Sequence, residues 1–126
     1  MNPDCHSGFG VGGTSFQKFG IVKPYNKDIQ TPGRNNVTRN EKDKYIFKVP
    51  LLRNIALTAP YFHDGSTWSL TEAVSIMAEY QIGVTLTDTE TNKIVAFLQT
   101  LTGDQPSFIF PTLPPSTANT PKPDRN

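Results

Sequence analysis

Residues 69–103 read SLTEAVSIMAEYQIGVTLTDTETNKIVAFLQTLTG and carry the strongest periodic pattern in the chain. Ser69 and Glu72 have the spacing of a capping box, in which a hydroxyl and a carboxylate each accept a hydrogen bond from an unpaired backbone N–H at a helix start. The helix that follows is predicted to run through about Glu79. Its apolar residues would share one face: Leu70, Ala73, Val74 and Met77.

Thr87 and Glu90 repeat the capping-box spacing and predict a second helix. Gly103 is placed to end this helix, because glycine readily adopts the left-handed conformation that closes a helix. Its apolar stripe consists of Ile94, Val95, Leu98 and Leu101. Two capped amphipathic helices predict a mainly α fold.

Long loops are predicted before these helices. Residues 50–57, PLLRNIAL, favour one or two helical turns, with Pro50 suited to the first position. Residues 1–49 are rich in glycine and proline and keep no helical or strand period, so they are expected to be mostly loop. We expect a short helix only at Cys5 and His6.

A proline-rich tail follows the second helix. Residues 104–126 hold six of the 11 prolines, which favours an extended segment that lies on a surface or reaches a partner. We therefore divide the chain into a domain at 1–103 and a tail at 104–126.

The composition excludes several classes of protein. With 126 residues and a net charge of +1, the chain has no basic stripe of the kind that binds nucleic acid. No apolar run approaches the roughly 20 residues needed to cross a bilayer, and Met1 is not followed by a signal peptide pattern. The single cysteine excludes an internal disulfide and a cysteine-rich zinc site. Apolar residues make up only 36%, so an apolar cofactor would help to complete the core.

The adjacent Cys5 and His6 resemble the second half of a haem c attachment motif. Attachment uses thiols that add to the haem vinyl groups and a neighbouring histidine that ligates iron. Asn2 stands where the first cysteine of the motif belongs. Taken alone, the pair is better explained as a cysteine that stands next to a histidine by chance. Met77 offers a thioether for the opposite side of the iron, although methionine at helical spacing is more often core packing.

Three stretches together carry a family resemblance. They are CHSGFGVGGTSFQKFG at 5–20, FKVPLLRNIALTAPYFHDGSTWSLTEAVSIM at 47–77 and NKIVAFLQTLTGDQP at 92–106. The chain resembles the C-terminal, high-potential haem domain of bacterial di-haem cytochrome c peroxidases, most specifically in LRNIALTAPYFHDG. The resemblance implies a mainly α, cytochrome c-like domain with long loops. It also implies that the N-terminal helix is missing, which would leave the stripe of the second helix without its usual partner.

The resemblance also assigns haem c as a cofactor. It implies that Cys5 forms a thioether to the haem, that His6 is the proximal iron ligand and that Met77 is the distal one. In related methylamine-utilisation enzymes a tyrosine replaces this methionine, so the chain looks like the peroxidase branch. Calcium is implied as well, held partly by the backbone carbonyls of Thr58 and Pro60.

Three further residues have competing interpretations. Arg53 could pair with a haem propionate or be an ordinary surface arginine. His63 could hydrogen-bond near the haem, but a packed supporting residue is the simpler interpretation. Trp68 could also lie near the haem, and a buried anchor is the simpler account.

The resemblance implies an electron-transfer function. Iron held by both His6 and Met77 has no open position for hydrogen peroxide, so this domain would accept electrons from a small cytochrome c or copper protein. It would pass them to the peroxidatic haem of an N-terminal domain, which the sequence lacks. The resemblance further implies the periplasm and a homodimer, and the incomplete motif suggests a fragment.

Two alternatives remain open at this point. The chain could be an oxidoreductase in its own right, with Met77 displaced from iron. It could instead be a haem-free remnant that acts only in packing or interaction.

Overall fold

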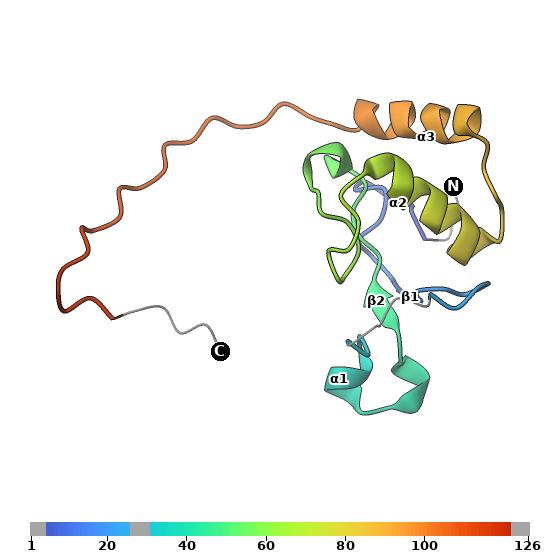
Figure 1. Cartoon of the computed structure of the whole chain (residues 1–126), viewed down its shortest axis with the longest axis horizontal. Coiled ribbons are helices and arrows are strands. Elements are labelled where there is room, and N and C mark those ends of the chain that lie inside the picture. Colours follow the sequence, from blue (N-terminus) through green and yellow to red (C-terminus); the bar gives the residue numbers. More distant parts are fainter. Residues whose placement is uncertain (1–4, 26–30, 122–126) are drawn as a thin grey trace.

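The computed structural model describes residues 5–25 and 31–121 (Figure 1). The prediction that concerns Asn2 lies outside these ranges. The described chain is partly helical and has few strands, with long loops between them. Its two longest helices, α2 (Leu70–Met77) and α3 (Asp88–Thr100), pack against each other. None of the helices in the described part is long and apolar enough to cross a membrane.

Helix α2 begins as predicted and then changes form. The Ser69 side chain accepts a hydrogen bond from the backbone N–H of Glu72, at 3.4 Å. The α-helix ends at Met77, and a π-helix, η3 (Ala78–Ile82), continues the rod until Gly83 adopts a φ of 79°. Of the predicted apolar face, Ala73 and Val74 are buried, and Leu70 and Met77 are half-buried.

Helix α3 shows the complete capping box. The Thr87 hydroxyl accepts from the backbone N–H of Glu90, and the Glu90 carboxylate accepts from the backbone N–H of Thr87. Its predicted stripe is largely covered, because Leu98 is only 4% exposed while Ile94, Val95 and Leu101 are half-buried. The covering partners include α2 and the short 3-10 helix η2 (Ile55–Leu57).

Gly103 does not end α3 in the way predicted. The helix stops at Thr100, and Leu101 has an ordinary negative φ of −80°. The backbone N–H of Gly103 donates instead to Oδ1 of Asn54, at 2.8 Å. The end of α3 is therefore fixed by the Asn54 side chain, from a loop that is distant in the sequence.

The N-terminal half is mostly loop, as predicted. A two-stranded antiparallel ladder pairs β1 (Phe16–Lys18) with β2 (Ile46–Lys48). Between the strands lie α1 (Asn35–Thr38) and the 3-10 helix η1 (Glu41–Asp43).

Two predicted helical segments turn out differently. The short helix expected at Cys5 and His6 is wrong, because these residues lie in a turn and bend, where successive glycines favour tight turns. Within residues 50–57, the single 3-10 turn begins at Ile55, so Pro50 does not start it.

A cluster of rings links the loops to the helices. His63 stacks on Phe47, with ring centroids 4.0 Å apart, and Phe19 packs edge-on against Tyr25 at 4.7 Å. Tyr25 in turn contacts Tyr80 of η3 at 5.3 Å. These ring contacts connect β2 and the segment after β1 with η3, which follows α2.

Replacing Leu98 with alanine should lower the free energy of unfolding by about 2–4 kcal/mol, because it removes a buried side chain and leaves a cavity. Urea denaturation followed by circular dichroism measures the change. Leu113→Ala is the matched control, since Leu113 is 81% exposed and its loss should change stability by less than about 0.5 kcal/mol. Equal effects from both substitutions would contradict the packing described for α3.

The stability of the haem-free chain should also depend on His63. Burial lowers the pKa of His63 below its ordinary value of 6.5, although Asp64 acts in the opposite direction. The folded chain therefore favours the neutral ring. This contribution is present above about pH 6.5 and is lost as the pH falls through the folded-state pKa.

Urea titrations between about pH 7.5 and pH 5 test this dependence. His63→Gln removes the ionisable ring, so its stability should fall less steeply with acidification than that of the parent chain. Parallel pH profiles for the two proteins would show that His63 does not contribute.

Candidate functional site

The loop that carries Cys5 and His6 packs closely against the segment at Pro50. Cys5 and His6 are both half-buried. The Leu52 backbone N–H donates to the Val11 carbonyl at 3.2 Å. Gly12 has a φ of 128°, and a Cβ at this position would collide with the Pro50 carbonyl oxygen and lie 3.1 Å from Nδ1 of His6. Gly12 therefore lets the histidine loop approach Pro50.

The His6 ring is held in a form that can ligate a metal. Burial lowers the pKa of His6 below 6.5, so the neutral imidazole is favoured near neutral pH. The backbone of Val11 acts on this pKa in the opposite direction. Even so, Nδ1 is buried and has no partner at hydrogen-bonding geometry among the described residues.

Met77 is fixed by contacts that its helix makes with the N-terminal loop. It is the last residue of α2, and η3 follows it directly. The Val22 N–H donates to the Tyr80 carbonyl at 3.1 Å, and Nε2 of Gln81 donates to the Lys18 carbonyl at 3.1 Å. Lys23 and Glu79 form an ion pair. Residues 5–23 therefore carry His6 near one end and contact η3, the π-helix after Met77, near the other.

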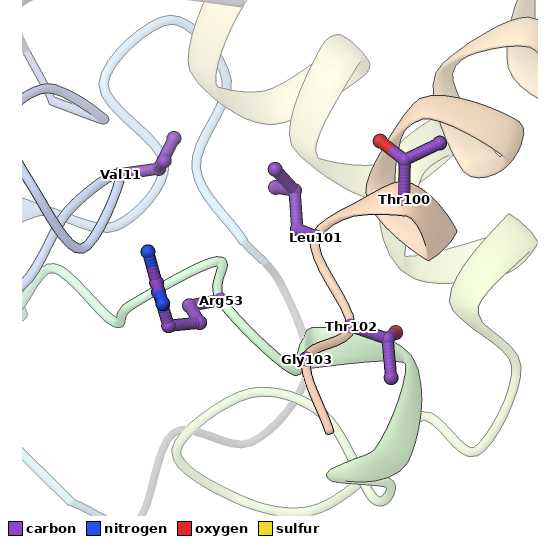
Figure 2. A pocket seen from close by; sticks show the side chains of 6 residues that line it. All are labelled: Val11, Arg53, Thr100, Leu101, Thr102 and Gly103. Atoms are coloured by element: carbon purple, nitrogen blue, oxygen red, sulfur yellow. The ribbon is translucent and has the colours of Figure 1, made fainter.

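Arg53 lies beside the histidine loop at a small cavity. Its guanidinium lies over the ring of Phe9, 4.8 Å from the centroid. The cavity has a volume of about 210 Å³ and is lined by Val11, Arg53, Thr100, Leu101, Thr102 and Gly103. Figure 2 shows the guanidinium pointing toward Val11, across from the end of α3. An exposed guanidinium at such a cavity can pair with an anionic group.

The predicted pocket residues take different positions. His63 stacks in the ring cluster but is exposed overall, and its role near a haem stays a prediction. Trp68 is 73% exposed, so the interpretation of it as a buried anchor is wrong. Tyr61 provides the buried ring in this stretch, and its hydroxyl donates to the Ile55 carbonyl at 3.1 Å. An antiparallel β-bridge pairs Tyr61 with Thr67, and Trp68, the residue after Thr67, faces solvent.

Thr58 and Pro60 are both exposed. The Thr58 hydroxyl donates to the Ile55 carbonyl at 3.1 Å. Among residues 5–25 and 31–121, no group of three or more histidine, cysteine, aspartate or glutamate side chains could hold a metal ion. The calcium site on these two carbonyls thus stays a prediction.

The donor set fits a haem c group. Such a group needs a thiol, a neutral imidazole and, for a high-potential site, a thioether. Cys5, His6 and Met77 provide these three donors, and the buried imidazole nitrogen without a partner is consistent with a ligand role.

Sequence reasoning missed three positioning residues. Gly12 controls the approach to Pro50, Asn54 holds the end of α3, and Gln81 binds the N-terminal loop. The glycine pair at 12–13 was a visible signal, but it resembles a phosphate loop only superficially. Asn54 and Gln81 act through contacts distant in sequence, which no local pattern indicates.

Comparisons with known proteins identify relatives. No protein-family model matches the chain. The chain is 53% identical over 118 residues to the cytochrome c551 peroxidase of Nitrosomonas europaea. The matched segment covers 94% of this chain and 35% of that protein. The cytochrome c551 peroxidase of Pseudomonas aeruginosa is 44% identical over 122 residues, with the same two coverages. The cytochrome c peroxidase of Escherichia coli is 48% identical over 102 residues, which cover 79% of this chain and 22% of that protein.

A solved structure supports the relationship. It is a MauG-like protein associated with microbial copper homeostasis, with a TM-score of 0.67 and 28% identity over 79% of this chain and 39% of that one. The chain spans about a third of the length of its curated peroxidase relatives. By its sequence identity over nearly its whole length, and in agreement with the resemblance seen in its motifs, this chain is a homologue of a segment of the bacterial cytochrome c peroxidases.

Proposed function

We propose that the chain is the electron-transfer haem c domain of a cytochrome c peroxidase, with a cytochrome c-like fold. The single observation that carries this proposal is the 53% identity to a cytochrome c551 peroxidase over 118 of the 126 residues, a span that takes in Met77. The MauG-like structural neighbour and the helical packing of α2 on α3 support the proposed fold.

Each donor has a proposed role that follows from its chemistry. His6 would ligate the haem iron through its neutral imidazole, because burial lowers the pKa of the ring. Cys5 would form the covalent thioether, and the Met77 sulfur would be the second iron ligand. When bound, the haem supplies reversible one-electron chemistry. The soft Met77 sulfur favours the reduced state, which suits a domain that accepts electrons.

The surrounding residues orient and neutralise the group. Arg53 has the exposed guanidinium needed to pair with a propionate. His63 and Trp68 are the other proposed pocket residues, the former through its ring cluster. Thr58 and Pro60 offer backbone carbonyls to calcium, a hard cation that prefers oxygen.

The proposed partners follow from the two proposed iron ligands. With both His6 and Met77 as ligands, the iron would have no free position for peroxide, so reduction of hydrogen peroxide to water would belong to a separate peroxidatic haem domain. A small cytochrome c or copper protein would donate the electrons. We propose the periplasm as the location, because haem c is attached outside the cytoplasm, and a homodimer as the assembly.

A haem-free remnant that acts only by packing is the second candidate. The position of Asn2 favours it, because one thiol of the attachment motif is replaced. It predicts that no haem becomes attached to the chain.

Expression in the periplasm with the haem c maturation system tests these two candidates. We expect covalent haem in the pyridine haemochrome spectrum, and Cys5→Ala should remove the covalent link because no second cysteine remains. A parent chain that matures without any haem would favour the remnant.

Met77→Leu tests the axial ligand. The oxidised parent protein should show the far-red charge-transfer band of a methionine–iron bond, and the substitution should abolish it. Ile76→Leu is the matched control on the neighbouring half-buried position and should keep the band. A band that survives Met77→Leu would exclude this residue as the ligand.

A further inference from the structure

The side chain of Gln81 connects η3 with the segment at the end of β1. Its Oε1 accepts hydrogen bonds from the backbone N–H groups of Gly20 and Ile21, the second at 3.0 Å. Its Nε2 donates to the Lys18 carbonyl oxygen at 3.1 Å. A primary amide can accept and donate at the same time, whereas a carboxylate can only accept and an ammonium group can only donate. Gln81 is therefore suited to all three backbone partners.

The segment after β1 has the shape that this amide requires. Gly20 is buried and has a φ of 77°, and a Cβ there would lie 2.8 Å from the Lys23 carbonyl oxygen. Glycine fits such a tight, left-handed turn without a steric cost. The turn directs the four consecutive N–H groups of residues 20–23 toward η3. The first two reach Gln81, and the last two reach the Tyr80 carbonyl oxygen at 3.1 and 3.3 Å. Figure 1 shows this segment, in blue, beside the far end of the rod that begins with α2.

The π-helical form of η3 keeps the Tyr80 carbonyl available to this segment. In an α-helix that continued past Met77, Tyr80 would accept a hydrogen bond from the N–H of Val84, four residues later. Here the Val84 N–H donates to the Ala78 carbonyl instead, at 3.0 Å. π-Helical turns are rare and occur frequently at functional sites. The wide turn and the loop contacts therefore belong together, because an α-helical turn would compete with the loop for Tyr80.

Met77 lies at the point where the two helical forms meet. It is the last residue of α2 and directly precedes η3. On its N-terminal side, α2 packs against α3. On its C-terminal side, Gln81 attaches η3 to residues 18–23. The backbone of Met77 is thus held from both sides, and the second attachment is made by the same loop that carries His6 near its other end.

We propose that Gln81 is a positioning residue for Met77 that strengthens the bond between the Met77 sulfur and the haem iron. This inference rests on the proposed function and deepens it, because it assigns the strength of one ligand bond to a side chain four residues further along the helix. Loss of the Gln81 hydrogen bonds lets η3 shift relative to the loop of His6. The Met77 sulfur then leaves the iron more often.

Displacement of Met77 by added imidazole measures this effect. The oxidised, haem-loaded chain is titrated with imidazole near neutral pH, and loss of the far-red charge-transfer band reports that methionine has been replaced. An added ligand binds only those molecules in which the iron position is free, so its apparent affinity rises with the fraction of molecules that Met77 has left. We expect Gln81→Ala to bind imidazole at least about tenfold more tightly than the parent chain, because three hydrogen bonds are lost.

Two further variants separate this role from a general effect on the fold. Gln99→Ala removes the same amide from an exposed position of α3 and should leave the imidazole affinity within about twofold of that of the parent chain. Gln81→Glu keeps the acceptor for Gly20 and Ile21 and loses the donor to Lys18, so its affinity should lie between those of the parent and Gln81→Ala. Far-UV circular dichroism checks that each titrated variant is folded, so the affinity reports the ligand bond and not unfolding.

The possible outcomes distinguish this inference from the proposed function. Equal imidazole affinities for the parent, Gln81→Ala and Gln99→Ala, in chains that all show the band, would overturn the role of Gln81 and leave the proposed function intact. Absence of the band from the parent chain would overturn the assignment of Met77, and this inference with it. If Gln81→Ala does not acquire haem, Gln81→Glu decides the question. An affinity at least about threefold tighter than that of Gln99→Ala supports the role of Gln81, and a smaller difference overturns it.

Discussion

The close approach of the histidine loop to Pro50 is the constraint on which the rest of the site depends. Gly12 makes it possible, because any side chain there would collide with the Pro50 carbonyl oxygen and crowd Nδ1 of His6. Beside this contact, the Val11 carbonyl accepts a hydrogen bond from the Leu52 N–H, in the segment that continues to Arg53 and Asn54. Gly12 thus lies where the loop of His6, the candidate iron ligand, meets the segment that carries Arg53, the candidate propionate partner, and Asn54, which binds the end of α3.

The same N-terminal loop also stabilises the opposite side of the structure. Its residues from Lys18 to Lys23 bind η3, the π-helix after Met77, through backbone, amide and ionic contacts. The buried apolar core of the described residues is small, so these polar contacts and the ring cluster carry much of the organisation. An apolar group held between such loops would stabilise the fold by roughly 25 cal/mol for each Å² of apolar surface that it buries. This suits a chain with few large buried side chains.

Local signals predicted the helices well. The capping box at Thr87 and the N-cap hydroxyl of Ser69, which forms only half of the predicted box, depend on residues three apart, so the sequence alone indicates them. The end of α3 could not be predicted in this way, because Asn54 reaches it from 49 residues away. The prediction for Trp68 failed for a related reason. Its size favours burial, but Tyr61 and Thr67, which form the β-bridge before it, are the buried residues. The ligand assignments came from the resemblance, and relatives at 44–53% identity confirm that resemblance while leaving the individual ligands as predictions.

The central proposal is that the imidazole of His6 and the sulfur of Met77 would together hold the haem iron. Proton NMR of the reduced, haem-loaded chain with labelled methionine methyl groups tests it most directly. The account predicts that the Met77 methyl signal is shifted far upfield by the porphyrin ring current, as a methyl group over the ring must be. Methionine methyl signals that all stay at their ordinary positions, in a protein with covalently bound haem, would contradict it.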